Sequence, residues 1–82
     1  MPSGRRITVA QMKPGQSGTV IAIGPGRGMR RLEAMGLRPG RRIVKISSVF
    51  GHGPVTLQIM GSTQLAIGYG MAQKILVEVD TA

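Results

Sequence analysis

The 82-residue sequence lacks cysteine and tryptophan, and its aromatic side chains are limited to Phe50 and Tyr69. The absence of cysteine excludes disulfides and thiolate metal sites. Two aromatic rings offer little for the base stacking of single-stranded nucleic-acid binders, or for grooves that take proline-rich peptides. Three acidic residues and one histidine also leave few groups for acid–base or nucleophilic catalysis, so we expect no enzymatic activity.

Long hydrophobic runs are absent too. No segment approaches the ~18 apolar residues of a membrane-spanning helix, and the two arginines near the N-terminus are not followed by the apolar region of a signal peptide. We therefore expect a soluble protein of the cytoplasm. Acidic residues are so few that the formal net charge is +8. This charge favours an anionic partner such as nucleic acid, an acidic protein surface or an anionic membrane leaflet.

Glycine and proline divide the chain into short apolar runs, a rhythm typical of a small β-sandwich or barrel. The clearest period-two alternation places Val55, Leu57 and Ile59 on one face of a strand. The runs predict five strands, at residues 18–24, 41–50, 55–60, 63–67 and 75–79. Residues 68–74 suggest one short helical turn before the last strand, and the whole chain forms a single domain.

A short helix is predicted between the first two of these strands, within the segment GMRRLEAMGLRPGRR of residues 28–42. Met29, Leu32 and Met35 recur every three residues and therefore share one helix face. Gly36 follows as a left-handed C-terminal cap, and Leu37 packs back on Leu32, as in a Schellman motif. Since about two turns of helix do not form alone in water, tertiary packing must hold this helix in place.

Two Pro-Gly pairs precede the first two predicted strands, in MKPGQ at residues 12–16 and in LRPGR at residues 37–41. Proline fixes φ at the second position of a turn and glycine accepts positive φ at the third, so both segments predict type II turns. The same turn is thus used twice at the start of a strand.

In order along the chain, the motifs KPG, GTVIAI, RRLEAMGLRPG, QLAI and A-x-K-I-x-V resemble the ferrous iron transport protein A (FeoA) family. The segment RRLEAMGLRPG is the most specific of these, and the resemblance extends from Thr8 to Val79. A similar module forms the C-terminal domain of some metal-dependent repressors. The resemblance implies a mostly β fold: a small SH3-like barrel of about five strands with a short helix inserted after the first strand. The barrel would span residues 8–80, behind a flexible N-terminal segment of residues 1–7.

The resemblance also implies a role, that of a small cytoplasmic accessory or regulatory protein of ferrous iron uptake with no required cofactor. The expected partner is FeoB, an inner-membrane permease with a cytoplasmic G domain, so the protein would be recruited to the inner membrane. We assign the partner-binding surface to the arginines around the helix and to one exposed methionine. These residues are Arg30, Arg31, Arg38, Arg41, Arg42 and Met60.

Two alternatives stay open. A turn that often carries an acid in the family reads GHGP here, and its His52, the sole histidine, could bind Fe(II) or Zn(II). A lone ligand binds weakly, so a metal-sensing site would also need Glu33, Glu78 or Asp80, or a second chain in a homodimer. Nonspecific nucleic-acid binding is the weaker alternative, because so short a helix presents few side chains that can reach bases.

Overall fold

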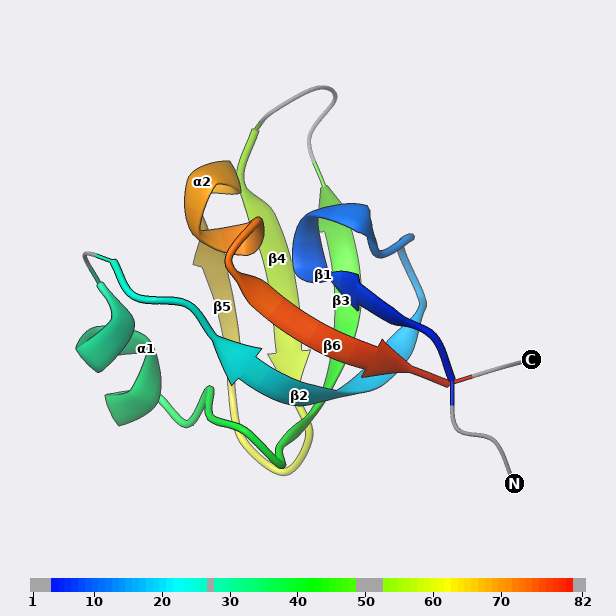
Figure 1. Ribbon diagram of the computed structural model, residues 1–82, viewed down its shortest axis with the longest axis horizontal. Helices are drawn as coiled ribbons and strands as arrows, with labels where there is room; N and C mark the ends of the chain where they lie inside the picture. The colour runs from blue at the N-terminus through cyan, green and yellow to red at the C-terminus, as the bar shows by residue number, and fades with distance from the viewer. Residues whose placement is uncertain (1–3, 27, 49–52, 81–82) are drawn as a thin grey trace.

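The computed structural model of the chain describes residues 4–26, 28–48 and 53–80. The described chain is mostly β (Figure 1), with six strands in one sheet beside two small helices and a 3₁₀ helix. In chain order the elements are β1 (Arg6–Thr8), the 3₁₀ helix η1 (Val9–Gln11), β2 (Ser17–Ile23), α1 (Met29–Ala34), β3 (Arg42–Ser48), β4 (Val55–Ile59), β5 (Gln64–Ile67), α2 (Tyr69–Ala72) and β6 (Ile75–Val79). No helix within the described ranges is long and apolar enough to cross a bilayer.

The strand order β1-β6-β2-β3-β4-β5 leaves β1 and β5 at the two edges of the sheet. Every neighbouring pair is antiparallel. In Figure 1, β2 and β6 cross in front of β3, β4 and β5, so the sheet folds over on itself around the core. Register shifts between Val20 and Ala22 and between Lys45 and Ser47 supply local bends of the kind that such a fold needs.

The edge strand β1 is an addition to the five strands that the sequence predicts. Its residues pair with β6, with Ile7 opposite Val77, so the sheet begins inside the segment 1–7 that the sequence suggested to be flexible. Three residues are too few to show a period-two pattern, which is why this strand was missed. The inserted helix α1 consequently follows the second strand of the sheet. Residues 1–3 lie outside the described ranges.

The alternation along the strands builds the core as predicted. In β4 and β6 every second residue is buried, and the residues between them are half-buried. The buried residues of these two strands are Val55, Leu57, Ile59, Ile75, Val77 and Val79. Both Pro-Gly turns are also confirmed, because Gly15 and Gly40 have φ of 88° and 92°. The N–H of the fourth turn residue donates to the carbonyl of the first, at 2.9 Å in one turn and 3.1 Å in the other.

One charged side chain lies within this core. Lys45 of β3 is 2% exposed, and its Nζ donates to the carbonyl oxygens of Val9 and Met12 at 3.1 Å and 2.6 Å. Val9 opens η1 and Met12 follows it, so the ammonium group ties η1 to β3. Burial lowers the pKa of Lys45, because an environment poor in water disfavours the charged form.

An apolar cleft beside helix α1 as the candidate functional site

Helix α1 is anchored at its C-terminal end by the Schellman motif that the sequence predicts. Gly36 has φ of 101°, and its N–H donates to the Glu33 carbonyl at 3.0 Å. The Leu37 N–H donates to the Leu32 carbonyl at 2.9 Å. Both Leu32 and Leu37 are buried, so this end of the helix is tied to the core by apolar contacts as well as by hydrogen bonds.

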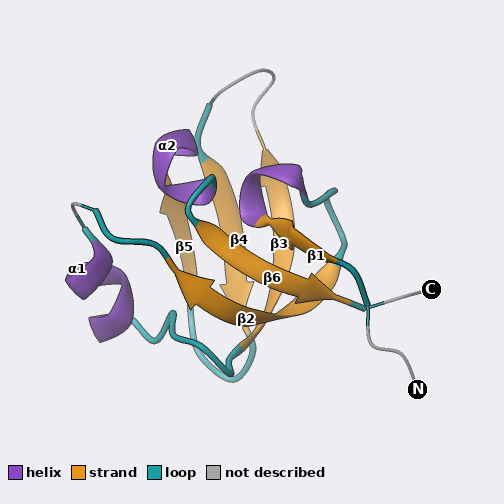
Figure 2. Ribbon diagram, viewed as in Figure 1, coloured by secondary structure: helices purple, strands orange, loops and turns teal. Residues whose placement is uncertain are grey.

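The loop that leads into α1 is held to the segment before β6. The Gly24 N–H donates to the Lys74 carbonyl at 2.7 Å, and Lys74 Nζ donates to the Pro25 carbonyl at 3.3 Å. Figure 2 shows the outcome: α1 stands beside the sheet and is joined to it by a loop at each end. The position of α1 is therefore fixed from both sides, although only one of its side chains is buried.

An open cleft of about 450 Å³ lies between α1 and the β5–α2 segment. Leu32 and Met35 line it on the α1 side, and Leu65, Ile67 and Met71 line it on the other. The sequence predicts that Met35 packs inward, but this side chain is 37% exposed because it borders the cleft. The cleft therefore presents an apolar surface that can accept the side chains of a partner.

Arg31 is the one charged residue among the described residues that line the cleft. Arg30 and Arg31 are both exposed on α1, and neither side chain has a hydrogen bond or ion pair with another described residue. Arg38 is likewise exposed, in the second Pro-Gly turn. The described lining residues combine apolar side chains with one guanidinium that is unpaired among the described residues, and none of them carries a side chain that usually acts as a general acid or base.

Arg41 and Met60 lie together at the turn between β4 and β5. Arg41 Nη2 donates to the Met60 carbonyl at 3.3 Å, and the Met60 side chain is 52% exposed, as its place in the alternation predicts. A Cβ on Gly36 would lie 3.8 Å from Ser62 Oγ, so this turn lies against the C-terminal end of α1. Arg41 and Met60 can therefore extend the surface that starts at the cleft.

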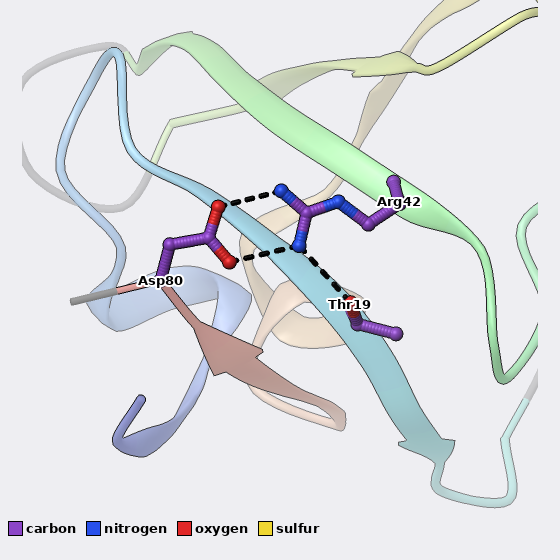
Figure 3. Close-up of polar contacts among 3 residues, drawn as sticks. All are labelled: Thr19, Arg42 and Asp80. Atoms are coloured by element: carbon purple, nitrogen blue, oxygen red, sulfur yellow. Dashed lines mark hydrogen bonds and ion pairs between the residues drawn. The ribbon is translucent and has the colours of Figure 1, made fainter. Parts of the chain in front are cut away.

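The guanidinium of Arg42 is hydrogen-bonded to Asp80 and Thr19 (Figure 3). Its Nη1 donates to Asp80 Oδ1 at 2.8 Å and to Thr19 Oγ1 at 3.2 Å, and its Nη2 donates to Asp80 Oδ2 at 2.5 Å. The hydrogen bonds from Arg42 lower the pKa of Asp80 and raise that of Arg42, because each charged form stabilises the other. Arg42 thus joins β3 to Thr19 of β2 and to Asp80, which follows β6, and none of these three residues lines the cleft.

The described residues do not supply a metal site. Within residues 4–26, 28–48 and 53–80, no three His, Cys, Asp or Glu side chains gather closely enough to hold an ion. Glu78 pairs with Arg6 at 3.2 Å, and Asp80 pairs with Arg42. His52, the predicted ligand, lies outside the described residues.

Sequence reasoning did not identify the β5 and α2 side of the cleft. The sequence predicts Leu65 and Ile67 only as part of a strand at residues 63–67. The available signal was the segment QLAI, a run without charge or proline that ends at glycine. Its position opposite α1 depends on a contact between segments about thirty residues apart, which periodicity does not report.

The folded sheet matches solved structures. The crystal structure of Stenotrophomonas maltophilia FeoA complexed with zinc, described as a prokaryotic SH3 domain protein, gives a TM-score of 0.73 at 21% identity, over 88% of this chain and 89% of that chain. A manganese-dependent transcriptional repressor in complex with manganese gives a TM-score of 0.82 at 20% identity, over 94% of this chain and 38% of the repressor. The fold is thus an SH3-like barrel, as predicted.

The sequence comparison places the chain more narrowly within this class. An iron uptake regulatory protein (FeoA) is 31% identical, with a TM-score of 0.79 over 92% of this chain and 97% of that chain. The FeoA domain model matches residues 7–79. The chain belongs to the FeoA family, which is associated with ferrous iron transport. The comparison with curated proteins found no match.

Proposed function

We propose that the protein is a small cytoplasmic accessory or regulatory protein of ferrous iron uptake and not an enzyme. It acts by docking on the cytoplasmic region of a FeoB-type permease at the inner membrane. Membership of the FeoA family supports the role in iron transport, and the relative described as an iron uptake regulatory protein supports a regulatory role.

The observation that carries the docking proposal is the cleft beside α1. Exposed apolar surface that is rimmed by polar groups is typical of interaction sites. Here Met35 is exposed beside Leu65 and Ile67, and Arg31 borders the same surface. An arginine without an intramolecular partner can form a bidentate pair with a carboxylate of the partner. A protein surface with apolar and acidic groups fits this combination.

The arrangement of the arginines favours a protein partner over nucleic acid. A phosphate backbone would be met by a continuous row of free cations. In this structure Arg42 is engaged by Asp80, Arg41 contacts the Met60 carbonyl, and the unpaired Arg31 borders an apolar cleft. The remaining net positive charge would speed encounter with an acidic protein and with the anionic inner leaflet.

The test is a binding measurement with the purified cytoplasmic region of the permease at physiological salt. Arg31→Glu should weaken binding by at least about tenfold, since losing one charge-assisted pair at an interface costs about 2 kcal/mol or more. Arg5→Glu is the matched control, because Arg5 is also exposed and directly precedes β1, the edge strand opposite β5.

The Arg5→Glu control separates the effect of the position of the charge from the effect of the change in net charge. Both variants change the charge by the same amount, so equal losses would mean that binding follows the overall charge and not the cleft. Unchanged binding of Arg31→Glu would remove the cleft rim from the docking surface. No binding by the wild-type protein, with a folded permease region, would refute docking itself.

A further inference from the structure

The free edge of β5 forms part of the cleft. Within the described residues, β5 pairs with β4 on one side and with no strand on the other. The cleft is lined on that side by Leu65, Ala66, Ile67 and Gly68. An unpaired edge strand is a ready template for another strand, and this one lies opposite a helix, across a space that is already open.

The hydrogen-bond alternation shows which backbone groups of β5 are available. The Ile59 N–H donates to the Thr63 carbonyl at 3.0 Å, which makes these two residues a hydrogen-bonded pair of the β4–β5 ladder. Such pairs alternate along an antiparallel ladder. Leu65 and Ile67 therefore bond to β4, whereas the backbone groups of Gln64 and Ala66 point away from it.

Three outward backbone groups of β5 have no partner among the described residues: the N–H of Gln64 and both the N–H and the carbonyl of Ala66. The carbonyl of Gln64 accepts the Thr63 hydroxyl at 3.2 Å. Three of the usual protections of an edge are missing here: the strand carries no lysine and no proline, and its ladder with β4 shows no bulge. The other edge differs, because β1 is only three residues long and carries Arg6, which is paired with Glu78.

We propose that the cleft takes an extended segment of the permease's cytoplasmic region as an added strand on β5. This inference deepens the proposed function and rests on it. About four residues of the segment would pair along β5, which is roughly 13 Å of extended chain. Every second side chain of the segment would enter the apolar space between α1 and β5, and an acidic residue of the segment would pair with Arg31. Strand addition of this kind takes its affinity from main-chain hydrogen bonds and its specificity from pockets for alternate side chains.

Amide hydrogen exchange of the wild-type protein, followed by NMR, tests the proposal directly. Without partner, the amides of Leu65 and Ile67 should exchange slowly and those of Gln64 and Ala66 rapidly. Adding the permease's cytoplasmic region should slow exchange at Gln64 and Ala66 by at least about tenfold, because both N–H groups become hydrogen-bonded. A helix or a loop bound in the same cleft would shift the α1 resonances without this two-residue alternation.

A pair of variants at one position provides the second measurement. Ala66→Pro removes the outward N–H, and an edge strand tolerates proline where that N–H faces away from its neighbour. It should weaken binding by about tenfold, whereas Ala66→Thr, which keeps the N–H, should stay within about twofold of wild type. Should Ala66→Pro fail to fold, the exchange measurement on the wild-type protein decides alone.

The outcomes distinguish this inference from the proposed function. Binding of the permease region without protection of Gln64 and Ala66 would overturn strand addition and leave docking standing. No binding at all would overturn both. Protection of the same two amides that grows with protein concentration, in the absence of the permease region, would assign the edge to a second copy of this chain and overturn the proposal.

Discussion

Gly18 lies in β2 at a point where the sheet leaves no room for a side chain. A Cβ there would lie 2.6 Å from Val77 Cγ1, 2.7 Å from the Glu78 carbonyl oxygen and 3.0 Å from Val79 Cα. Two of these three atoms belong to the backbone of β6, which pairs Gly18 with Val79. The mutation Gly18→Ala can therefore be accommodated only if β2 and β6 move apart.

The expected loss of stability follows from three contributions. Overpacking by one methyl group costs about 1–3 kcal/mol, and each weakened ladder hydrogen bond costs about 0.5–1.5 kcal/mol. Alanine restricts the unfolded chain, which offsets about 0.4–1 kcal/mol. We expect a net decrease of about 2 kcal/mol in the free energy of unfolding. In a domain of this size that lowers Tm by about 8–16 °C.

Thermal and urea unfolding followed by circular dichroism measure this effect. Gly70→Ala is the matched control, because a Cβ on Gly70 meets no atom within 4 Å and alanine favours the helical conformation of α2 by about 0.5–1 kcal/mol. A Tm of Gly18→Ala equal to or above that of the wild type would refute the reasoning, since it would mean that β2 and β6 separate without cost.

Three further predictions concern the buried lysine, the surface ion pair and the helix cap. Burial lowers the pKa of Lys45 in the folded protein, so the stability of the wild type relative to Lys45→Met should be greatest above the unfolded pKa of about 10.4 and should fall as the pH drops through the folded value. A difference in urea midpoints that does not change with pH would contradict this. Arg42→Ala should lower the free energy of unfolding slightly at neutral pH. The difference from wild type should shrink as Asp80 is protonated below about pH 4, and also in ~1 M salt. A difference that persists under both conditions would mean that the Arg42–Asp80 ion pair does not cause it. Gly36→Ala should lower the free energy of unfolding by about 1–2 kcal/mol, since φ is 101° there; an unchanged urea midpoint would show that α1 can end without its left-handed residue.

The sequence predicted those parts of the fold in which burial or backbone geometry requires particular residues at short, regular spacings. Val55, Leu57 and Ile59 alternate because one face of β4 is buried, and Gly36 is needed where the chain takes a positive φ. These constraints are local, so the residues express them directly. The strand β1 carries no such constraint, because its pairing depends on β6, which lies at the other end of the chain.

The candidate site is harder to predict because it is formed between elements. In the sequence, Arg38, Arg41 and Arg42 are close neighbours and were assigned to one surface together with the arginines of the helix. In the structure, Arg41 contacts the Met60 carbonyl whereas Arg42 reaches Asp80, since adjacent residues at the start of a strand point in opposite directions. Proximity along the chain therefore does not show which of these arginines have side chains that point the same way.

The net charge of +8 is thus a poor guide to the proposed binding surface, because several of the charged residues form ion pairs or are buried within the fold. Arg6 and Arg42 form ion pairs, and Lys45 is buried against backbone carbonyls. Arg31 differs in that it is exposed, unpaired among the described residues and placed beside an apolar cleft. A free cation alone would attract any anion at a distance. Under the strand addition proposed above, the combination with apolar walls and the open edge of β5 would select a partner that presents an acidic residue within an extended apolar segment, a requirement more specific than charge.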